Sequence, residues 1–371
     1  MEHVFWINGK NLDPDQTKAA TTIPHAESFL LRGPAGSGKT NILLLRAKAL
    51  VFMKKSNIKI IVFTSSLRDF LREGCVQYGI PPEIVVTGMQ FFKEFLLENS
   101  VSCDLSGQFE PDRLLLAGEA NALIKAKGIS NTYDALLIDE AQDYMDTELK
   151  VFRALAERLV LAADSRQSIY RIEQTEGLLE ELVDGKVVSL KYHYRSGLHL
   201  CKVADAILKS SAGYPPIKGE CKYKEDERPS SVNLTGCPTF QDQISVILDK
   251  LKEQVALYPG ERIGVLFPKN DQLKLFLDAF EYTKIPNKNL IWIDTLHGGK
   301  GWEFSAVHIG GCEALNKMGP VQKRLIYTGV LRGRTSASLY FTGSVPGYLD
   351  SALAILSPPV PAPTLDQLLG G

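Results

Sequence analysis

The 371-residue sequence has no long apolar stretch and few cysteines. No segment approaches the roughly 20 consecutive apolar residues that a bilayer-spanning helix needs, so we expect no membrane association. The six cysteines include no CxxC pair, which argues against a zinc site or a disulfide framework and favours a reducing, cytoplasmic location. The first residues also lack the basic region and apolar run of a signal peptide.

Acidic residues are missing from two stretches, although the formal net charge of the whole chain is only −1. The first stretch runs from Ser28 to Arg68 and the second from Ala314 to Leu349, and both contain several lysines and arginines. Basic surfaces of this kind suit phosphate, either of a nucleotide or of a nucleic-acid backbone. The alternative explanation is that these lysines are simply exposed to water on helix faces and bind no phosphate.

Short β-rich apolar runs alternate with helical patterns, which predicts a parallel α/β architecture with two similar sheets in tandem. The expected strands are 28–31, 59–64, 135–138, 159–163 and 187–190 in the first sheet, and 231–234, 263–267, 290–293, 306–309 and 338–342 in the second. The expected helices are 41–53, 67–78, 112–127, 147–158, 241–258, 271–280 and 321–331. At this length we expect a first domain at 1–188, a second at 189–349, and a proline-rich, extended tail at 350–371. The end of that tail, 365–369, is expected to be disordered, and a short docking segment is the alternative.

The segment from Gly33 to Thr40 reads GPAGSGKT, follows an apolar run and opens a helical pattern. This is the arrangement of a phosphate-binding loop, whose backbone N–H groups close around phosphate oxygens. Lys39 would reach the β- and γ-phosphates, and Thr40 would hold Mg²⁺. The residues expected to bind the nucleotide here are Gly33, Ala35, Gly36, Ser37, Gly38, Lys39 and Thr40.

A second nucleotide signature is the apolar run 136–138, which ends in Asp139 and Glu140. Ligands of parallel sheets gather at the carboxyl ends of the strands, beside the phosphate loop. Asp139 can hold the Mg²⁺ shell, and Glu140 can deprotonate a water for attack on the γ-phosphate. The two signatures together predict an ATPase that uses ATP and Mg²⁺.

Further motifs follow in order along nearly the whole chain. They are 12–16 (LDPDQ), 63–65 (FTS), 87–91 (TGMQF), 163–170 (ADSRQSIY), 192–196 (YHYRS), 295–304 (TLHGGKGWEF) and 327–334 (YTGVLRGR). With the phosphate loop and the DEAQ segment, they resemble the motifs of the UvrD/Rep/PcrA-like superfamily 1 helicases. The resemblance implies two tandem RecA-like domains with mostly parallel sheets and an ATP cleft between them. It also implies movement along a single strand, DNA more than RNA, from 3′ to 5′.

Individual roles follow from the same resemblance. Gln167 would couple the γ-phosphate to the strand, and Arg195 and Arg332 would act as arginine fingers, because the guanidinium fork matches phosphate oxygens. The implied contacts to adenine and ribose are Gln16, Tyr194 and Glu303. The implied nucleic-acid contacts are Phe63, Thr64, Ser65, Thr87, Tyr170, Thr295, His297 and Trp302.

Some departures from the family concern nucleic-acid contact. Ile172 stands where the family has an aromatic residue, which would stack on a base and contribute about 1–3 kcal/mol. Asn41 stands where the family has an arginine on the adenine side. The family's inserted subdomains are reduced to a small insertion at about 97–130 and a short segment between 196 and 231.

These departures leave a second class of function open. The chain would then be an ATP-hydrolysing switch or recruitment subunit that controls a protein partner, such as a nuclease or defence effector, with little unwinding of its own. A third class, a P-loop kinase or GTPase, leaves the YHYRS and KGWEF motifs unexplained.

Overall fold

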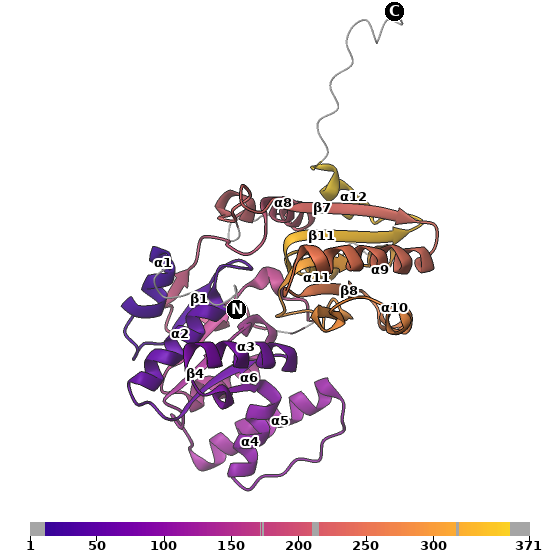
Figure 1. The fold of residues 1–371 in the computed structure, drawn as a ribbon. Coiled ribbons are helices and arrows are strands. Elements are labelled where there is room, and N and C mark those ends of the chain that lie inside the picture. Colours follow the sequence, from indigo (N-terminus) through magenta and orange to yellow (C-terminus); the bar gives the residue numbers. More distant parts are fainter. Residues whose placement is uncertain (1–11, 171, 173, 210–214, 317–318, 357–371) are drawn as a thin grey trace, which may run out of the picture.

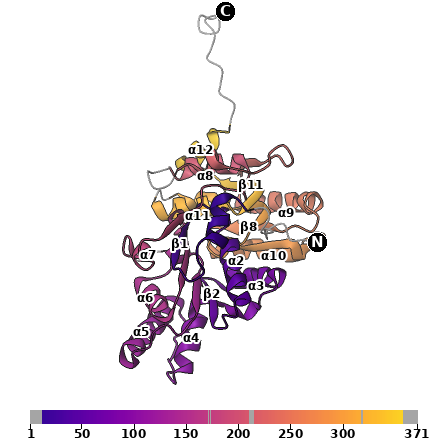
Figure 2. The ribbon, with the colours of Figure 1, turned by 90° about the vertical axis from the view of Figure 1, so that its left-hand side faces the viewer.

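The computed structural model describes residues 12–170, 172, 174–209, 215–316 and 319–356. Its strands form two parallel sheets, the first at the lower left and the second at the upper right of Figure 1, and Figure 2 shows the same ribbon turned by 90°. The predicted α/β class with two parallel sheets is confirmed, and the arrangement is consistent with tandem RecA-like domains. We call the part through the first sheet the first half, and the part from residue 190 the second half.

The first sheet has the strand order β3-β2-β4-β5-β1-β6. Its strands are β1 (Phe29–Arg32), β2 (Ile58–Val62), β3 (Val85–Thr87), β4 (Ala135–Ile138), β5 (Leu159–Ala163) and β6 (Val187–Ser189). The α-helices of this half are α1 (Pro14–Thr17), α2 (Lys39–Phe52), α3 (Ser65–Tyr78), α4 (Gly88–Glu98), α5 (Phe109–Lys127), α6 (Asp146–Leu155) and α7 (Leu178–Glu181). Every residue of β4 and β5 is buried, as expected for central strands that helices cover on both faces.

The second sheet has the strand order β7-β11-β10-β8-β9. Its strands are β7 (Ser231–Cys237), β8 (Ile263–Phe267), β9 (Ile291–Thr295), β10 (Phe304–Ile309) and β11 (Gly333–Thr342). Its α-helices are α8 (Leu198–Ile207), α9 (Phe240–Leu257), α10 (Asn270–Tyr282), α11 (Pro320–Val330) and α12 (Gly347–Ala354). In the described part of the chain, no helix combines the length and apolar character needed to cross a bilayer.

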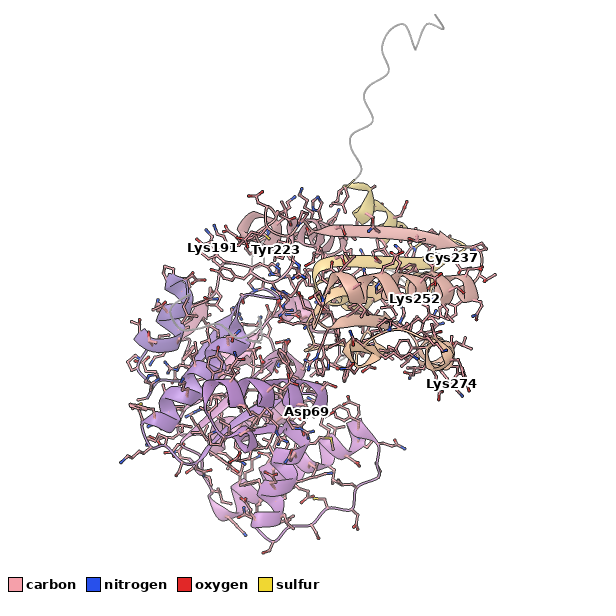
Figure 3. The ribbon with its side chains drawn as sticks, viewed as in Figure 1. Asp69, Lys191, Tyr223, Cys237, Lys252 and Lys274 are labelled. Atoms are coloured by element: carbon pink, nitrogen blue, oxygen red, sulfur yellow. The ribbon has the colours of Figure 1, made fainter. Side chains whose placement is uncertain are left out.

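The connection between the sheets contains Lys191 and Tyr223, which Figure 3 labels. A 3.1 Å hydrogen bond between Tyr223 Oη and Thr335 Oγ1 ties this connection to β11. The predicted domain boundary after residue 188 falls inside β6, whose Ser189 still pairs with Arg32 of β1.

The structure contains elements that the sequence pattern does not predict. Strand β3 has only three residues, too few to show a period, and α4 and α8 begin next to segments that the motif comparison assigned to ligand contacts. The predicted tail at 350–371 overlaps α12, whose Leu349 and Ala352 are buried because the helix packs against α8 and β7. The prolines of that tail lie outside the described residues.

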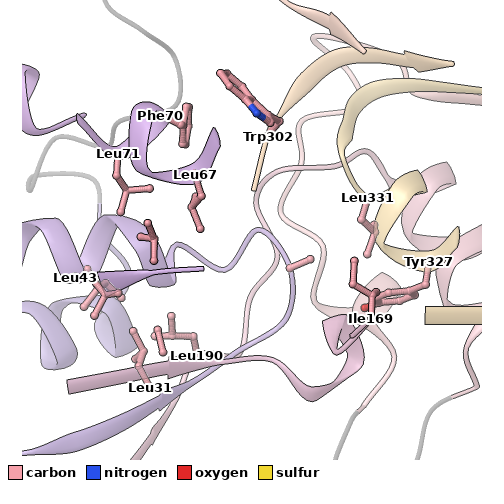
Figure 4. Packing of buried hydrophobic residues seen from close by; sticks show 14 of the residues in the cluster. Leu31, Leu43, Leu67, Phe70, Leu71, Ile169, Leu190, Trp302, Tyr327 and Leu331 are labelled. Atoms are coloured by element: carbon pink, nitrogen blue, oxygen red, sulfur yellow. The ribbon is translucent and has the colours of Figure 1, made fainter. Parts of the chain in front are cut away.

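Apolar side chains from both halves meet between the sheets. Figure 4 shows Leu67 and Phe70 of α3 facing Trp302 of the second half, and Ile169 beside Tyr327 of α11. All five side chains belong to one buried cluster that extends across both sheets. The two halves are therefore held together by apolar packing as well as by the polar contacts described next.

Candidate functional site

The phosphate loop connects β1 to α2 and depends on glycine at two positions. Gly38 forms the N-cap of α2 with a φ of +89°, a left-handed conformation that suits glycine. A Cβ added to Gly36 would lie 2.6 Å from Cβ of Arg195 and 2.8 Å from the ring of His193. The loop thus packs closely against the second half. The N-terminus of α2, which attracts anions, begins directly after the loop and so lies close to this contact.

Lys39 is the first residue of α2 and is only 7% exposed. Its Nζ donates hydrogen bonds to the carbonyl oxygens of Gly33, at 2.8 Å, and Pro34, at 3.1 Å. Burial lowers the pKa of Lys39, although three nearby carboxylates oppose this shift. A phosphate is a stronger acceptor than these neutral carbonyls, so it would compete well for the ammonium group.

Asp139 and Glu140 follow β4 and face the phosphate loop. Thr40 Oγ1 donates to Asp139 Oδ2 at 2.8 Å. Burial, followed by the charge of Glu140, raises the pKa of Asp139 to about 6. Burial would raise the pKa of Glu140 as well, but nearby cations, Lys300 first, lower it. The Thr40 hydroxyl and an Asp139 carboxylate oxygen are a donor set that fits Mg²⁺, which commonly uses one or two carboxylates together with phosphate oxygens and waters.

Two arginines of the second half reach the same region. Arg332 donates to Gln167 Oε1 at 2.5 Å, and Gln167 Nε2 donates to Asp164 Oδ2 at 3.1 Å. Arg195 Nε lies 2.7 Å from Glu303 Oε1. Burial and the charge of Arg195 lower the pKa of Arg332 to about 10, which still leaves it cationic at neutral pH. Both guanidinium groups are thus held in the cleft by side chains that a phosphate could replace.

The residues expected to recognise adenine lie on the other side of the loop. Gln16 is buried in α1, and its Nε2 donates to the carbonyl oxygen of Ser37 at 2.9 Å. Gln16 Oε1 also accepts from the backbone N–H of Asp13, at 3.1 Å, and Tyr194 Oη donates to Asp13 Oδ2 at 2.5 Å. Asp13 therefore connects Gln16 to Tyr194 across the two halves.

A cavity of about 220 Å³ brings most of the predicted nucleotide residues together. It is lined by Gly36, Ser37, Gly38, Lys39, Thr40, Asn41, Asp139, Glu140, Gln167, Tyr194, Arg195, Glu303 and Arg334. Gly33, Ala35 and Gln16 lie outside this lining, and Arg332 lines a smaller cavity that shares Thr40 and Asp139. Small-molecule sites usually measure about 300–1,000 Å³, so a nucleotide would require this cleft to widen.

A larger cavity, of about 490 Å³, lies on the other side of Gly33 and Pro34. Its lining includes Arg32, Leu179 and Ile217, but not Lys39 or Asp139. Size alone therefore does not identify the nucleotide site, and the convergence of side chains is the better criterion.

Lys300 belongs to this site, although its sequence motif alone predicts no role for it. Its Nζ lies 2.5 Å from Asp143 Oδ2, 2.8 Å from the carbonyl oxygen of Gln167 and 3.9 Å from Glu140 Oε2. Burial raises the pKa of Asp143 to about 7 even beside this ammonium group. The sequence does contain a signal that could have identified Lys300, because this residue is the lysine of the TLHGGKGWEF motif.

His193 is a second residue of the site whose role its sequence motif does not predict. Its Nε2 accepts from the backbone N–H of Ser196 at 2.8 Å, and its Nδ1 is hydrogen-bonded to the carbonyl oxygen of Ala35. These partners require the neutral ring with the proton on Nδ1. Burial lowers the pKa of His193 to about 3, which is consistent with that state. His193 thereby attaches the phosphate loop to the YHYRS segment.

An aromatic cluster lies where β2, β5 and β9 end. The ring centroids of Phe63 and Tyr170 are 4.7 Å apart, and those of Tyr170 and His297 are 5.9 Å apart. Tyr170 and His297 are half-buried, whereas Phe63 is only 9% exposed. Tyr170 and His297 thus offer a surface shared by both halves, and Phe63 supports it from inside.

The hydroxyl residues predicted to contact nucleic acid mostly have local structural tasks. Thr64 Oγ1 and Thr87 Oγ1 cap α3 and α4, each accepting a backbone hydrogen bond of 3.2 Å. Thr295 Oγ1 accepts from the backbone N–H of Gly298 at 3.0 Å. Ser65, the first residue of α3, is exposed. A hydroxyl oxygen that accepts one bond still carries a donor proton, so capping does not exclude a phosphate contact.

Trp302 is buried rather than exposed on such a surface. It is 5% exposed, its ring centroid is 4.2 Å from that of Trp292, and the guanidinium carbon of Arg262 lies 4.7 Å from its ring. The expected nucleic-acid contact is thus not available in this structure, because the large apolar indole is buried between the halves. Ile172 is half-buried, and Asn41 Oδ1 accepts from Tyr78 Oη at 2.9 Å, which links α2 to α3.

Comparisons with known proteins support a nucleotide-binding domain in the first half of the chain. Residues 16–173 match a family model described as an AAA domain, which covers less than half of the chain. No curated protein matches. One solved structure, the C-terminal domain of a possible DNA helicase from Lactobacillus plantarum WCFS1, is 18% identical, with a TM-score of 0.33 over 43% of this chain and 93% of that one. A similarity this low carries no argument about function. The first half is therefore similar to an AAA-type, P-loop nucleotide-binding domain.

Proposed function

We propose that this chain is an ATPase that moves along single-stranded nucleic acid, DNA rather than RNA, from 3′ to 5′. Each sheet with its helices would be one RecA-like domain, and ATP would bind between the two. The observation that carries the proposal is the shared cavity: Lys39 and Glu140 from the first half line the same space as Arg195 and Glu303 from the second.

Phosphate recognition would fall to the loop and to Lys39, whose ammonium group would exchange its carbonyl partners for the β- and γ-phosphates. Thr40 and Asp139 would hold Mg²⁺, which, when bound, would offset the charge of the phosphate oxygens. Glu140 would accept a proton from the attacking water, and the nearby cations that lower its pKa keep its carboxylate in the ionised form that can accept one.

Closure of the cleft would be driven by the arginines. Arg332 would move from Gln167, and Arg195 from Glu303, to the γ-phosphate, where guanidinium groups stabilise developing negative charge. Glu303 would then be available to the ribose, and Gln16 and Tyr194 to the adenine. Hydrolysis would remove the γ-phosphate and restore the pairs that the free protein has.

A strand would lie across both halves, over Tyr170 from the first and His297 from the second. Alternate opening and closing of the cleft would change the separation of these two contacts and so move the strand. Thr64, Ser65, Thr87 and Thr295 would add backbone contacts at the same edge, with Phe63 supporting Tyr170.

The test uses the isolated chain and duplex DNA that carries a single-stranded tail. We expect ATP-dependent displacement of the strand when the tail has a 3′ end, little displacement with a 5′ tail, and none with Lys39→Ala. Unwinding from the 5′ tail alone would contradict the proposed polarity. ATP hydrolysis without movement on any tail would contradict the motor function.

The second candidate is an ATP-hydrolysing switch or recruitment subunit that acts on a protein partner such as a nuclease. It is favoured by Ile172, which offers no aromatic face, and by Trp302, which is buried between the halves. If strand displacement appears only in preparations that keep a copurifying protein, the switch function is the better account.

A further inference from the structure

Arg113, on α5, is among the largest fully buried side chains of the described residues. Its Nε donates to Glu148 Oε1 at 2.8 Å, and its Nη2 donates to Glu148 Oε2 at 2.5 Å. The same Nη2 donates to the carbonyl oxygen of Asp143 at 2.6 Å. A buried ion pair of this kind contributes little to net stability compared with apolar packing, so stability alone is a weak reason for its presence.

The face of the Arg113 guanidinium lies against aromatic rings. Its central carbon is 4.8 Å from the ring centroid of Phe63 and 5.9 Å from that of Tyr144. Phe63 in turn packs against Tyr170. The face of the Arg113 guanidinium therefore contacts Phe63, which supports Tyr170 in the proposed strand surface. The edge of the same guanidinium binds the backbone of Asp143.

Asp143 has contacts on two sides. Its carbonyl oxygen accepts from Arg113, and its carboxylate binds Lys300 at 2.5 Å. Lys300 lies 3.9 Å from Glu140, the residue proposed to activate water. A displacement of Asp143 would therefore change the position of the cation beside Glu140.

We propose that Arg113 is a positioning residue that couples strand binding at Tyr170 to the Asp143–Lys300 pair beside Glu140. The inference rests on the proposed function, and it gives the small insertion at 97–130 a regulatory role in that function. A base on Tyr170 moves Phe63, Phe63 moves the guanidinium against it, and the guanidinium moves the backbone of Asp143. Arg113 itself touches neither nucleotide nor strand.

The test compares ATP hydrolysis with and without saturating oligo(dT), together with the thermal unfolding midpoint. The main variant is the double substitution Arg113→Met and Glu148→Gln, which leaves no buried charge without its partner and keeps an acceptor for the backbone N–H of Met145. We expect most of the stimulation to be lost, so that the ratio of the rates with and without strand falls close to 1. Arg113→Lys keeps the charge but not the planar fork, so it should restore the ratio only in part.

Arg46→Met is the matched control. Arg46 is also buried, donates to the carbonyl oxygens of Ile23 and Pro24 at 2.7 and 3.0 Å, and lies 5.0 Å from the ring of Phe29. Its loss should lower the thermal midpoint but leave the stimulation ratio at the wild-type value, because none of these contacts reaches Asp143 or Phe63.

Three outcomes would overturn the inference. A double variant with the wild-type ratio would leave the proposed function intact and remove the role of Arg113. An equal fall in Arg46→Met would mean that the ratio follows stability alone. A wild-type protein that hydrolyses ATP at the same rate with and without strand would contradict the proposed function, and the coupling with it.

Discussion

Lys300 Nζ, from the second half of the chain, lies 2.5 Å from Asp143 Oδ2 in the first half, and both side chains are buried. The pair joins the segment that follows the DEAQ motif to the KGWEF motif. Burial raises the pKa of Asp143 to about 7, so the ammonium group only partly offsets the cost of burying this carboxylate. This ion pair between the two halves lies directly beside Glu140, the residue proposed to activate water, because Lys300 Nζ is 3.9 Å from Glu140 Oε2.

Lys300→Met should destabilise the protein by about 3–5 kcal/mol, because it leaves Asp143 buried beside no cation of its own. Adding Asp143→Asn should restore much of the thermal midpoint but not the ATPase rate, since Glu140 still lacks its neighbouring ammonium group. Thermal unfolding and ATP hydrolysis, measured on both variants, check the two parts separately.

The matched control for this pair is Glu73→Gln, which breaks a half-exposed ion pair between the two halves, that of Glu73 with Arg262. This substitution should lower the free energy of unfolding by only about 0–1 kcal/mol. Equal losses of stability in Glu73→Gln and Lys300→Met would show that the buried pair is not special.

Arg332→Ala and Arg195→Ala should each lower kcat by about 10³–10⁵-fold, with a smaller effect on nucleotide affinity, because the arginines would act mainly in the closed state. Arg332→Lys should recover little, since lysine lacks the planar fork. Arg228→Ala, which breaks a partly exposed pair with Glu261 in the second half, is the control and should hydrolyse ATP normally. Rates close to wild type in both finger variants would exclude the proposed roles.

The pH dependence should follow Asp139, whose pKa burial raises to about 6. Below that pH the carboxyl is protonated and cannot bind a cation, so kcat/KM should fall by about tenfold for each further pH unit. Higher Mg²⁺ concentrations should move the midpoint to lower pH, because the cation competes with the proton. A profile that is flat through pH 6, or a midpoint that ignores Mg²⁺, would contradict the assignment.

Substitutions of Tyr170 and Trp302 should have different effects, the first on the affinity for a strand and the second on the stability of the fold. Tyr170→Ala should weaken binding of labelled oligo(dT) by about 1–3 kcal/mol in fluorescence anisotropy, with a modest change in thermal midpoint. Trp302→Ala should lower stability by about 3–5 kcal/mol and leave the affinity of the folded protein nearly unchanged. If Trp302→Ala instead weakened strand binding and Tyr170→Ala mainly lowered stability, Trp302 would be the residue that contacts the strand.

The parts of the molecule that sequence could predict are those specified locally. The phosphate loop and the Asp139–Glu140 pair each depend on a few consecutive residues, and the two sheets follow from short apolar runs that alternate with helical patterns. The contacts of Lys300 with Asp143 and of His193 with Ala35 depend instead on how distant segments pack. The burial of Trp302 has the same origin, because a tryptophan on a loop fits an apolar interface and a base-stacking surface equally well.

The most direct test of the central claim is steady-state ATP hydrolysis by the purified chain, with and without saturating single-stranded DNA. The account predicts severalfold stimulation by the strand and no hydrolysis in Lys39→Ala, whose ammonium group would otherwise bind the phosphates. Wild-type hydrolysis that no DNA or RNA of any length stimulates, or a Lys39→Ala variant as active as the wild type, would contradict it.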